Sequence, residues 1–183
     1  MTRCPDCIST RPYIPKFLKR KRVTQTDSKH YYREKYSGSV FLIKAGGRII
    51  TDPQALSDLL GTIRDLLSAE IRVLLVYGGG DAIDEALNKA GLESKKANGR
   101  RITNAKTIPV VKATIAGQLG FTIGAEMRRI RMPGLCLNMI PPAWGEIALR
   151  QRDPEDYGYD GTLRKVHPAP VLAALNANSF IAC

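Results

Sequence analysis

Two short runs of aliphatic residues stand out in the first half of the chain, and each ends at a cluster of glycines. Val40–Ile43 runs into Lys44-Ala45-Gly46-Gly47, and Arg72–Tyr77 stops at Gly78-Gly79-Gly80. A short apolar run that ends at glycine is typical of a buried strand followed by a tight turn. The pattern therefore predicts two buried strands with a glycine turn after each.

After each turn, the apolar positions change to helical spacing. Asp52 can cap a helix whose first turn contains Pro53. The apolar residues of this helix recur along one face, at Leu56, Leu59, Leu60, Ile63, Leu66 and Leu67. A second helix is expected from about 81 to 90, with Gly91 at its C-terminal end. Strand, glycine turn and helix, repeated in this order, indicate a parallel sheet with right-handed crossovers.

The second half of the chain has shorter and less regular patterns. Asn98-Gly99 marks a tight turn, and Thr103 can cap a helix that runs to about Leu119. Met132-Pro133-Gly134 ends a basic helix. Further strands are expected at 135–140, 163–166 and 179–183, and a short helix at 170–176. The predicted fold class is α/β, a three-layer α/β/α sandwich with a mainly parallel sheet.

The first 36 residues differ from the rest in charge. The formal net charge of the chain is +11, and the ten Lys/Arg and three Asp/Glu of residues 1–36 supply +7 of it. This segment shows no sustained helical or strand period, so we predict a basic, flexible extension over 1–36 and a folded domain over 37–183. An organellar transit segment and an anion-binding arm are the alternatives for the extension.

Composition narrows the class of protein further. No run approaches the roughly 20 consecutive apolar residues of a membrane span, and no aromatic stacking motif accompanies the basic cluster at 16–22. We therefore expect neither a membrane nor a nucleic-acid partner. Cys4 and Cys7 have the spacing of half a zinc site, but His30 and His167 are the only histidines. We expect no metal site, and a reducing, cytoplasmic location.

The two glycine turns are the strongest candidates for chemistry. Both are expected at the carboxyl edge of the sheet, where ligands bind in open α/β folds. Glycine lets the backbone approach a phosphate closely, and the helix that follows offers free N–H groups. Lys44 precedes the first glycines and could reach a phosphoryl group as a point charge. Simple strand-to-helix turns without a ligand are the alternative, and neither turn matches a Walker A or dinucleotide-binding sequence.

Three segments in order resemble the N-terminal motifs of N-acetylglutamate kinases, a branch of the amino-acid kinase family. They are Ile43-Lys44-Ala45-Gly46-Gly47, Val76-Tyr77-Gly78-Gly79-Gly80-Asp81-Ala82-Ile83-Asp84 and Asn98-Gly99-Arg100-Arg101-Ile102-Thr103. Their spacing is also similar to that of the family. The last segment, asparagine-glycine-x-arginine-x-threonine, favours this branch over other amino-acid kinases. The resemblance covers roughly residues 40–116 and returns faintly at 157–161.

The resemblance implies that the chain holds the N-terminal, acceptor-binding lobe of a kinase. The implied reaction transfers the γ-phosphate of ATP, with Mg²⁺, to the side-chain carboxylate of N-acetylglutamate or a similar acylated amino acid, in arginine biosynthesis. The implied catalytic residue is Lys44, which stabilises charge on the phosphoryl group. The implied substrate-binding residues are Gly78, Gly79 and Arg101, and the implied phosphate-binding residues are Gly46, Gly47 and Gly80. Arg101 would pair with a carboxylate of the acceptor.

Several departures from the family pattern leave an alternative open. Tyr77 stands where histidine is usual, Gly120 and Phe121 replace an asparagine-lysine pair, and residues 138–142 lack the expected aspartate. The chain also ends before the family's nucleotide-binding lobe. The alternative is a non-catalytic regulatory or binding relative that keeps the acceptor pocket. We expect a homo-oligomer or a completing partner chain, because a sheet edge at the C-terminal end would be exposed.

Overall fold

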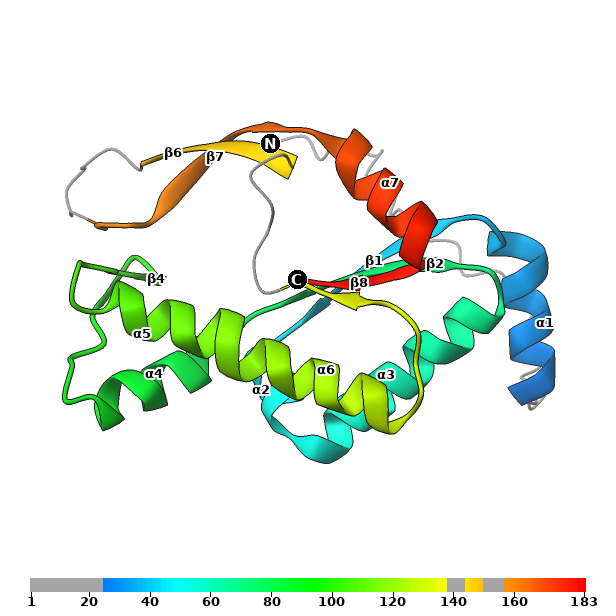
Figure 1. The fold of residues 1–183 in the computed structure, drawn as a ribbon, viewed down its shortest axis with the longest axis horizontal. Coiled ribbons are helices and arrows are strands. Elements are labelled where there is room, and N and C mark those ends of the chain that lie inside the picture. Colours follow the sequence, from blue (N-terminus) through cyan, green and yellow to red (C-terminus); the bar gives the residue numbers. More distant parts are fainter. Residues whose placement is uncertain (1–24, 138–143, 150–156) are drawn as a thin grey trace, which may run out of the picture.

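The centre of the molecule is a four-stranded parallel sheet (Figure 1). The structure, a computed structural model, describes residues 25–137, 144–149 and 157–183. The sheet order is β1-β2-β8-β5, and all three pairings are parallel. The four strands are β1 (Val40–Ala45), β2 (Arg72–Tyr77), β8 (Phe180–Ala182) and β5 (Leu135–Cys136). The two strands predicted before the glycine turns are therefore adjacent and parallel.

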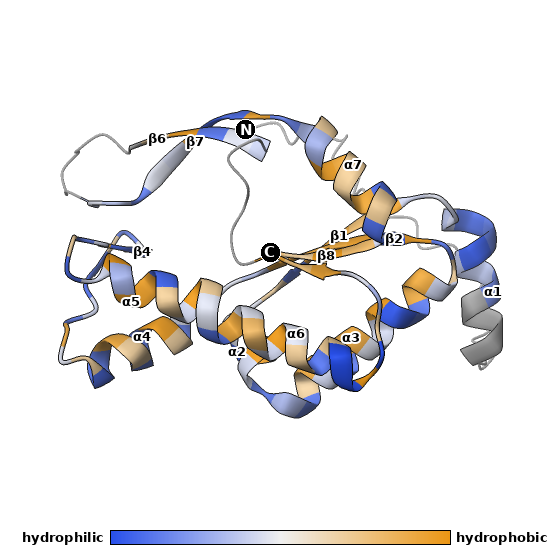
Figure 2. Ribbon diagram, viewed as in Figure 1, coloured by the Kyte–Doolittle hydropathy of each residue, from blue (hydrophilic) through white to orange (hydrophobic). Residues whose placement is uncertain are grey.

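Helices cover both faces of this sheet, so the predicted three-layer α/β/α sandwich is confirmed (Figure 1). One face packs on α3 (Pro53–Ser68) and α6 (Gly120–Arg129), and the other packs on α7 (Pro168–Asn178). Figure 2 shows that the strands are hydrophobic and that α3 and α6 carry mixed faces. The main core combines side chains that are at most 1% exposed: Ile50, Leu60, Ile63, Val73, Leu75, Leu119, Ile123 and Phe180.

The helices after the glycine turns begin and end as the sequence predicts. Asp52 caps α3, since its carboxylate accepts a hydrogen bond from the Ala55 amide at 2.8 Å, and Pro53 occupies the first turn. The helix α4 (Gly80–Lys89) is followed by Gly91 in the left-handed region, at φ +68°. A further short helix, α2 (Gly47–Thr51), lies between the first turn and α3 and has no counterpart in the prediction.

The N-terminal prediction is wrong for residues 25–36, which form a helix, α1 (Gln25–Tyr36). Most of its residues are polar, and they show no amphipathic pattern. Tertiary contacts hold it: Arg33 pairs with Glu70, Ser37 donates to Glu70 at 2.9 Å, and the Tyr36 ring packs edge-on against Phe41. The basic cluster at 16–22 and the two N-terminal cysteines lie outside the described residues.

Thr103 does not cap a helix. Its backbone instead forms a bridge to Gly158, and the helix begins at Ile108. The turn before it is closed by Asn104, whose side chain accepts hydrogen bonds from the amides of Lys106 and Thr107 at 2.9 and 3.1 Å. The helix also runs past its predicted end, because α5 (Ile108–Lys112), the π-helix η1 (Ala113–Leu119) and α6 are continuous.

The continuous helix of α5, η1 and α6 is long and apolar enough to cross a membrane by length and composition alone. Such a criterion is also met by core helices of soluble proteins. Here Leu119, Ile123 and Met127 are buried in the main core. Their packing gives this helix a structural role in the described fold.

The C-terminal part contains one strand that the sequence analysis missed. β6 (Gly145–Leu149) pairs antiparallel with β7 (Gly161–Val166), which contains the predicted strand at 163–166. The strand predicted at 135–140 is found over Leu135–Cys136, and residues 138–143 lie outside the described ranges. The C-terminal strand β8 lies between β2 and β5, so it is not the exposed edge that we expected; β1 and β5 are the edges.

We predict that Asp52→Ala lowers the free energy of unfolding by about 1 kcal/mol, because α3 loses its side-chain cap. Asp52→Asn keeps an acceptor oxygen and should stay close to wild type. Urea unfolding of the full chain measures both. An equal loss in the two variants would show that the charge of Asp52, rather than its cap, stabilises the helix.

Candidate anion-binding site

The two glycine turns meet at the carboxyl edge of the sheet. The Gly78 amide donates a hydrogen bond to the Ala45 carbonyl at 3.1 Å, which joins the ends of β1 and β2. A Cβ atom added to Gly47 would lie 3.1 Å from the Gly78 oxygen and 3.2 Å from the Gly79 Cα. The two turns are therefore in contact through their backbones, in agreement with the prediction that both lie at the carboxyl edge of the sheet.

The glycines of the two turns fall into two groups. Gly47 and Gly79 are packed, since a Cβ at Gly79 would come within 2.7 Å of the Leu119 side chain in η1. Gly46, Gly78 and Gly80 face open space, because a Cβ there would meet nothing within 4 Å. The packed pair holds the turns together, and the open three leave room for a ligand to approach the backbone.

Both turns present the start of a helix. Gly46 and Gly79 are the N-cap residues of α2 and α4, and neither helix has a side-chain hydrogen bond at its cap. First-turn N–H groups have no partner within their own helix, and the helix dipole is positive at this end. The edge thus offers backbone donors of the kind that bind phosphate or carboxylate.

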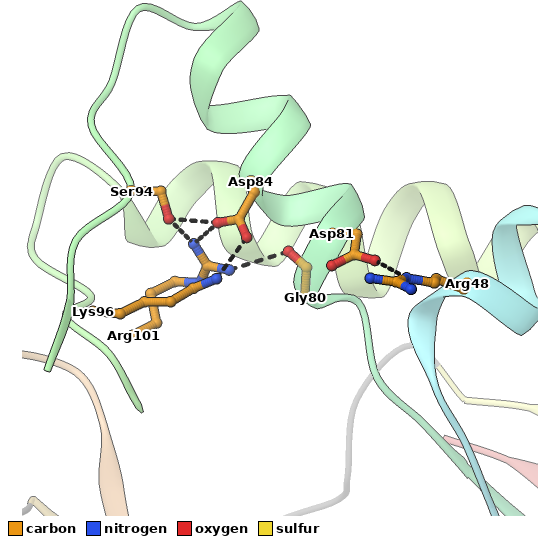
Figure 3. A network of polar contacts seen from close by, with 7 residues as sticks. All are labelled: Arg48, Gly80, Asp81, Asp84, Ser94, Lys96 and Arg101. Atoms are coloured by element: carbon orange, nitrogen blue, oxygen red, sulfur yellow. Dashed lines mark hydrogen bonds and ion pairs between the residues drawn. The ribbon is translucent and has the colours of Figure 1, made fainter. Parts of the chain in front are cut away.

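Arg101 lies against the second turn. It comes from a hairpin of β3 (Lys96–Ala97) and β4 (Arg100–Arg101), whose turn residues Asn98 and Gly99 both have positive φ. The guanidinium Nη2 donates to the Gly80 carbonyl at 3.1 Å. Its Nη1 donates to Asp84 and to Ser94 (Figure 3). The arginine side chain is only 12% exposed, so its position is fixed by these contacts.

Asp84 is the charge partner of Arg101. The Arg101 guanidinium holds the pKa of this carboxyl far below its ordinary value of 3.8, and hydrogen bonds from Lys96 and Ser94 act in the same direction. Lys96 Nζ lies 2.7 Å from the second carboxylate oxygen. Asp84 is therefore ionised at neutral pH, and the charge of Arg101 is already paired before any ligand binds.

The hairpin of β3 and β4 also contacts residues 157–161, the second segment that resembles the kinase family. Asn98 donates to the Tyr157 hydroxyl at 3.1 Å, and Arg100 lies 3.4 Å from Asp160. Gly158 has φ +64°, and a Cβ there would clash with the Thr103 carbonyl at 2.2 Å. These contacts place the 157–161 segment beside the hairpin that carries Arg101.

Lys44 projects from the other face of β1. Ala45 is buried in the main core, and Lys44, its neighbour along the strand, is exposed and in register with Val76 of β2. Within the described residues, the Lys44 side chain forms no ion pair or hydrogen bond. Its charge is therefore available to a ligand at the end of the strand.

Tyr77 occupies the position where the family pattern has histidine. The side chain is 7% exposed and belongs to the main core. Burial, with smaller effects from Cys136 and Cys183, raises the pKa of its phenol to about 12. Tyr77 is thus neutral at physiological pH and cannot supply the positive charge that an imidazolium could.

Five residues of this edge were not singled out by the sequence analysis: Arg48, Asp81, Asp84, Ser94 and Lys96. Of these, Asp81 and Asp84 carried a signal, because both stand in the segment directly after the glycine triplet. Among the described residues, no group of three His, Cys, Asp or Glu side chains could hold a metal ion. Asp160 pairs with Arg100, and residues 150–156 lie outside the described ranges.

Comparison with known proteins points to one family. The model of the amino acid kinase family matches residues 39–183. The acetylglutamate kinase of Cytophaga hutchinsonii is 33% identical over 141 residues, which cover 75% of this chain and 51% of that protein. The acetylglutamate kinase of Aeromonas salmonicida is 36% identical over 143 residues, 76% of this chain and 53% of that protein. The chain thus spans about half the length of the curated relatives it matches.

Solved structures show the same fold. N-acetylglutamate synthase of Neisseria gonorrhoeae, in complex with coenzyme A and L-arginine, superposes with a TM-score of 0.69 at 19% identity, over 85% of this chain and 37% of that one. A protein of Streptococcus mutans gives a TM-score of 0.65 at 21% identity, over 79% of this chain and 56% of that one. At these identities the likeness concerns the fold alone.

We predict that Gly47→Ala destabilises the protein by about 1–3 kcal/mol, because the added methyl group presses on the backbone of the second turn. Gly46→Ala is the matched control, because it adds the same methyl group at the preceding residue, where φ is −71° and the Cβ would meet no atom within 4 Å. This variant should leave the stability nearly unchanged. Thermal or urea unfolding compares the two. Equal effects would contradict the contact between the turns.

Asp84 should stabilise the protein above the pKa that it has in the unfolded chain. Its folded pKa is depressed, so this contribution is complete at neutral pH and is lost as the pH falls below about 4. Urea unfolding of wild type and Asp84→Asn at several pH values measures it. The wild type should be the more stable protein at pH 7, and the difference should shrink toward pH 2. A difference that does not change with pH would contradict the Asp84–Arg101 ion pair.

Proposed function

Because the chain belongs to the amino acid kinase family, we propose that it acts in an acetylglutamate-kinase type of phosphoryl transfer in arginine biosynthesis. The acceptor in this proposal is the side-chain carboxylate of N-acetylglutamate or a similar acylated amino acid. The observation that carries it is the contact of two glycine turns with open space in front of Gly46, Gly78 and Gly80, beside a fixed arginine. Similarity to the acetylglutamate kinases supports the choice of acceptor.

The open glycines and the first-turn amides fit phosphate and carboxylate oxygens, which need close backbone approach and N–H donors. ATP with Mg²⁺ supplies the phosphoryl group in this proposal. Lys44 has an unpaired charge among the described residues, and it stabilises negative charge on the group in transfer. A carboxylate is already nucleophilic at neutral pH, so the chain needs no general base, only positioning and charge neutralisation.

Arg101 binds a carboxylate of the acceptor in this proposal. Three of its five N–H groups are engaged, because Nη1 donates to Asp84 and Ser94 and Nη2 donates to Gly80. The remaining N–H groups can face the ligand while the ion pair prevents rotation of the side chain. An arginine that is already immobilised loses less side-chain entropy when it binds a ligand.

A non-catalytic acceptor-binding relative is the second candidate. The observation that favours it is Tyr77, which is buried and neutral where the family pattern has histidine. In this case the same turns and Arg101 would bind the acceptor without turnover.

We also propose a reducing, cytoplasmic location, which suits the two thiols Cys136 and Cys183, both free in the structure.

Calorimetric titration of the full chain with N-acetylglutamate, beside an assay of ATP consumption, tests the proposal. Binding with turnover supports the kinase, binding without turnover supports the regulatory relative, and no binding contradicts both. Arg101→Ala should weaken acceptor binding by at least about tenfold, since it removes a charge-assisted hydrogen bond. Arg128→Ala, on the exposed face of α6, removes the same charge elsewhere and should leave the affinity unchanged.

A further inference from the structure

A second guanidinium lies at the glycine turns, on the other side of Gly80 from Arg101 (Figure 3). It belongs to Arg48, in the first turn of α2, directly after Gly46 and Gly47. Arg48 Nε donates to a carboxylate oxygen of Asp81 at 2.7 Å. The pair therefore connects the helix that follows the first turn with the helix that follows the second.

Both arginines are held by the same helix. α4 supplies Asp81 to Arg48 and Asp84 to Arg101, and the two carboxylates are three positions apart, on one side of the helix. The two pairs lie on either side of Gly80, whose Cβ position is open (Figure 3). The helix start thus has a cation on each side, which is the arrangement that a ligand with two separated negative charges needs.

The two pairs differ in how tightly they are held. Arg101 is 12% exposed and has three partners, whereas the Arg48 side chain is 88% exposed and Asp81 is 62% exposed. Within the described residues, Nε is the only group of Arg48 that has a partner, so both of its Nη groups are free. An ion pair this exposed contributes little in water, so Arg48 can shift at small cost and place its Nη groups on a ligand oxygen while Nε stays beside Asp81.

Arg48 also neutralises the negative charge of Asp81 at the start of α4. A carboxylate in the first turn of α4 stands where the helix start attracts an anion, and it repels a negative ligand there. Arg48 neutralises that carboxylate. Without Arg48, the same glycine turns would present an unpaired negative charge to the ligand.

From this arrangement we infer that Arg48 is a second anion-binding residue of the site and contacts the side-chain carboxylate of a dianionic acceptor. Arg101 contacts the other carboxylate. The assignment rests on the proposed function. The positions of the two arginines decide which carboxylate each one contacts. Arg48 lies in the helix that begins at the first glycine turn, the turn that Lys44 precedes. Arg101 donates to the Gly80 carbonyl in the second turn.

Two ligands that differ in one charge test the inference. N-acetylglutamate carries both carboxylates, and N-acetylglutamine replaces the side-chain carboxylate by a neutral amide. Arg48→Ala should weaken binding of N-acetylglutamate about tenfold and binding of N-acetylglutamine clearly less, because the unpaired Asp81 repels both ligands but only N-acetylglutamate loses a contact with Arg48. Arg101→Ala should weaken binding of both ligands. Asp81→Asn should tighten binding of N-acetylglutamate, because it removes a repulsive charge and releases Arg48. Calorimetry on the full chain gives all the dissociation constants.

Lys89→Ala is the matched control, since Lys89 pairs with Glu85 at 2.6 Å on the same helix, far from its start, and is 74% exposed. It should not change either affinity. Equal losses for both ligands in Arg48→Ala, no loss, or weaker binding in Asp81→Asn would each overturn the inference while leaving the proposed function in place. If the wild type binds neither ligand, both the inference and the proposed function are wrong.

Discussion

The candidate site depends on the backbone contact between two glycine turns at the ends of adjacent parallel strands. Gly47 lies so close to Gly78 and Gly79 that any side chain there would press on the peptide backbone. The hydrogen bond from Gly78 to the Ala45 carbonyl ties the strand ends together at the same place. This contact brings two helix starts to one point on the sheet edge, and it leaves the outer glycines free.

Helix α4 organises the charges around that point. Its start is positive because of the helix dipole, and Asp81 and Asp84 each pair with an arginine from another part of the chain. Asp84 holds Arg101 in a partly buried network with Ser94 and Lys96, whereas the contact of Asp81 is exposed. One helix thus combines a rigid cation on one side of the turn with a movable cation on the other. A rigid and a movable cation together suit a site that holds one anionic group of a ligand in place while a second anionic group reacts.

Local sequence determined the elements around the turns because each had a local physical signal. Aliphatic runs that end at glycine identified β1 and β2, and the leucine spacing after Asp52 identified α3. Where elements lacked such a signal, the prediction failed. The helix α1 has no amphipathic pattern and depends on contacts with Glu70 and Phe41. Thr103 pairs with a residue more than fifty positions away instead of capping the next helix. The strand β6 has no clear alternation and exists because β7 pairs with it.

By itself, the sequence established the α/β class, the parallel strand pair, the glycine turns and the position of Lys44, since these follow from periodicity and from the conformational freedom of glycine. The partners of Arg101 and Arg48 were decided only by the tertiary structure. The ion pair across 17 positions depends on how helix α4 packs with the 92–95 segment and the hairpin, and the pair across 33 positions depends on how α4 packs against α2. No local pattern encodes such a distance, because the side-chain positions follow from the fold and not from their spacing along the chain.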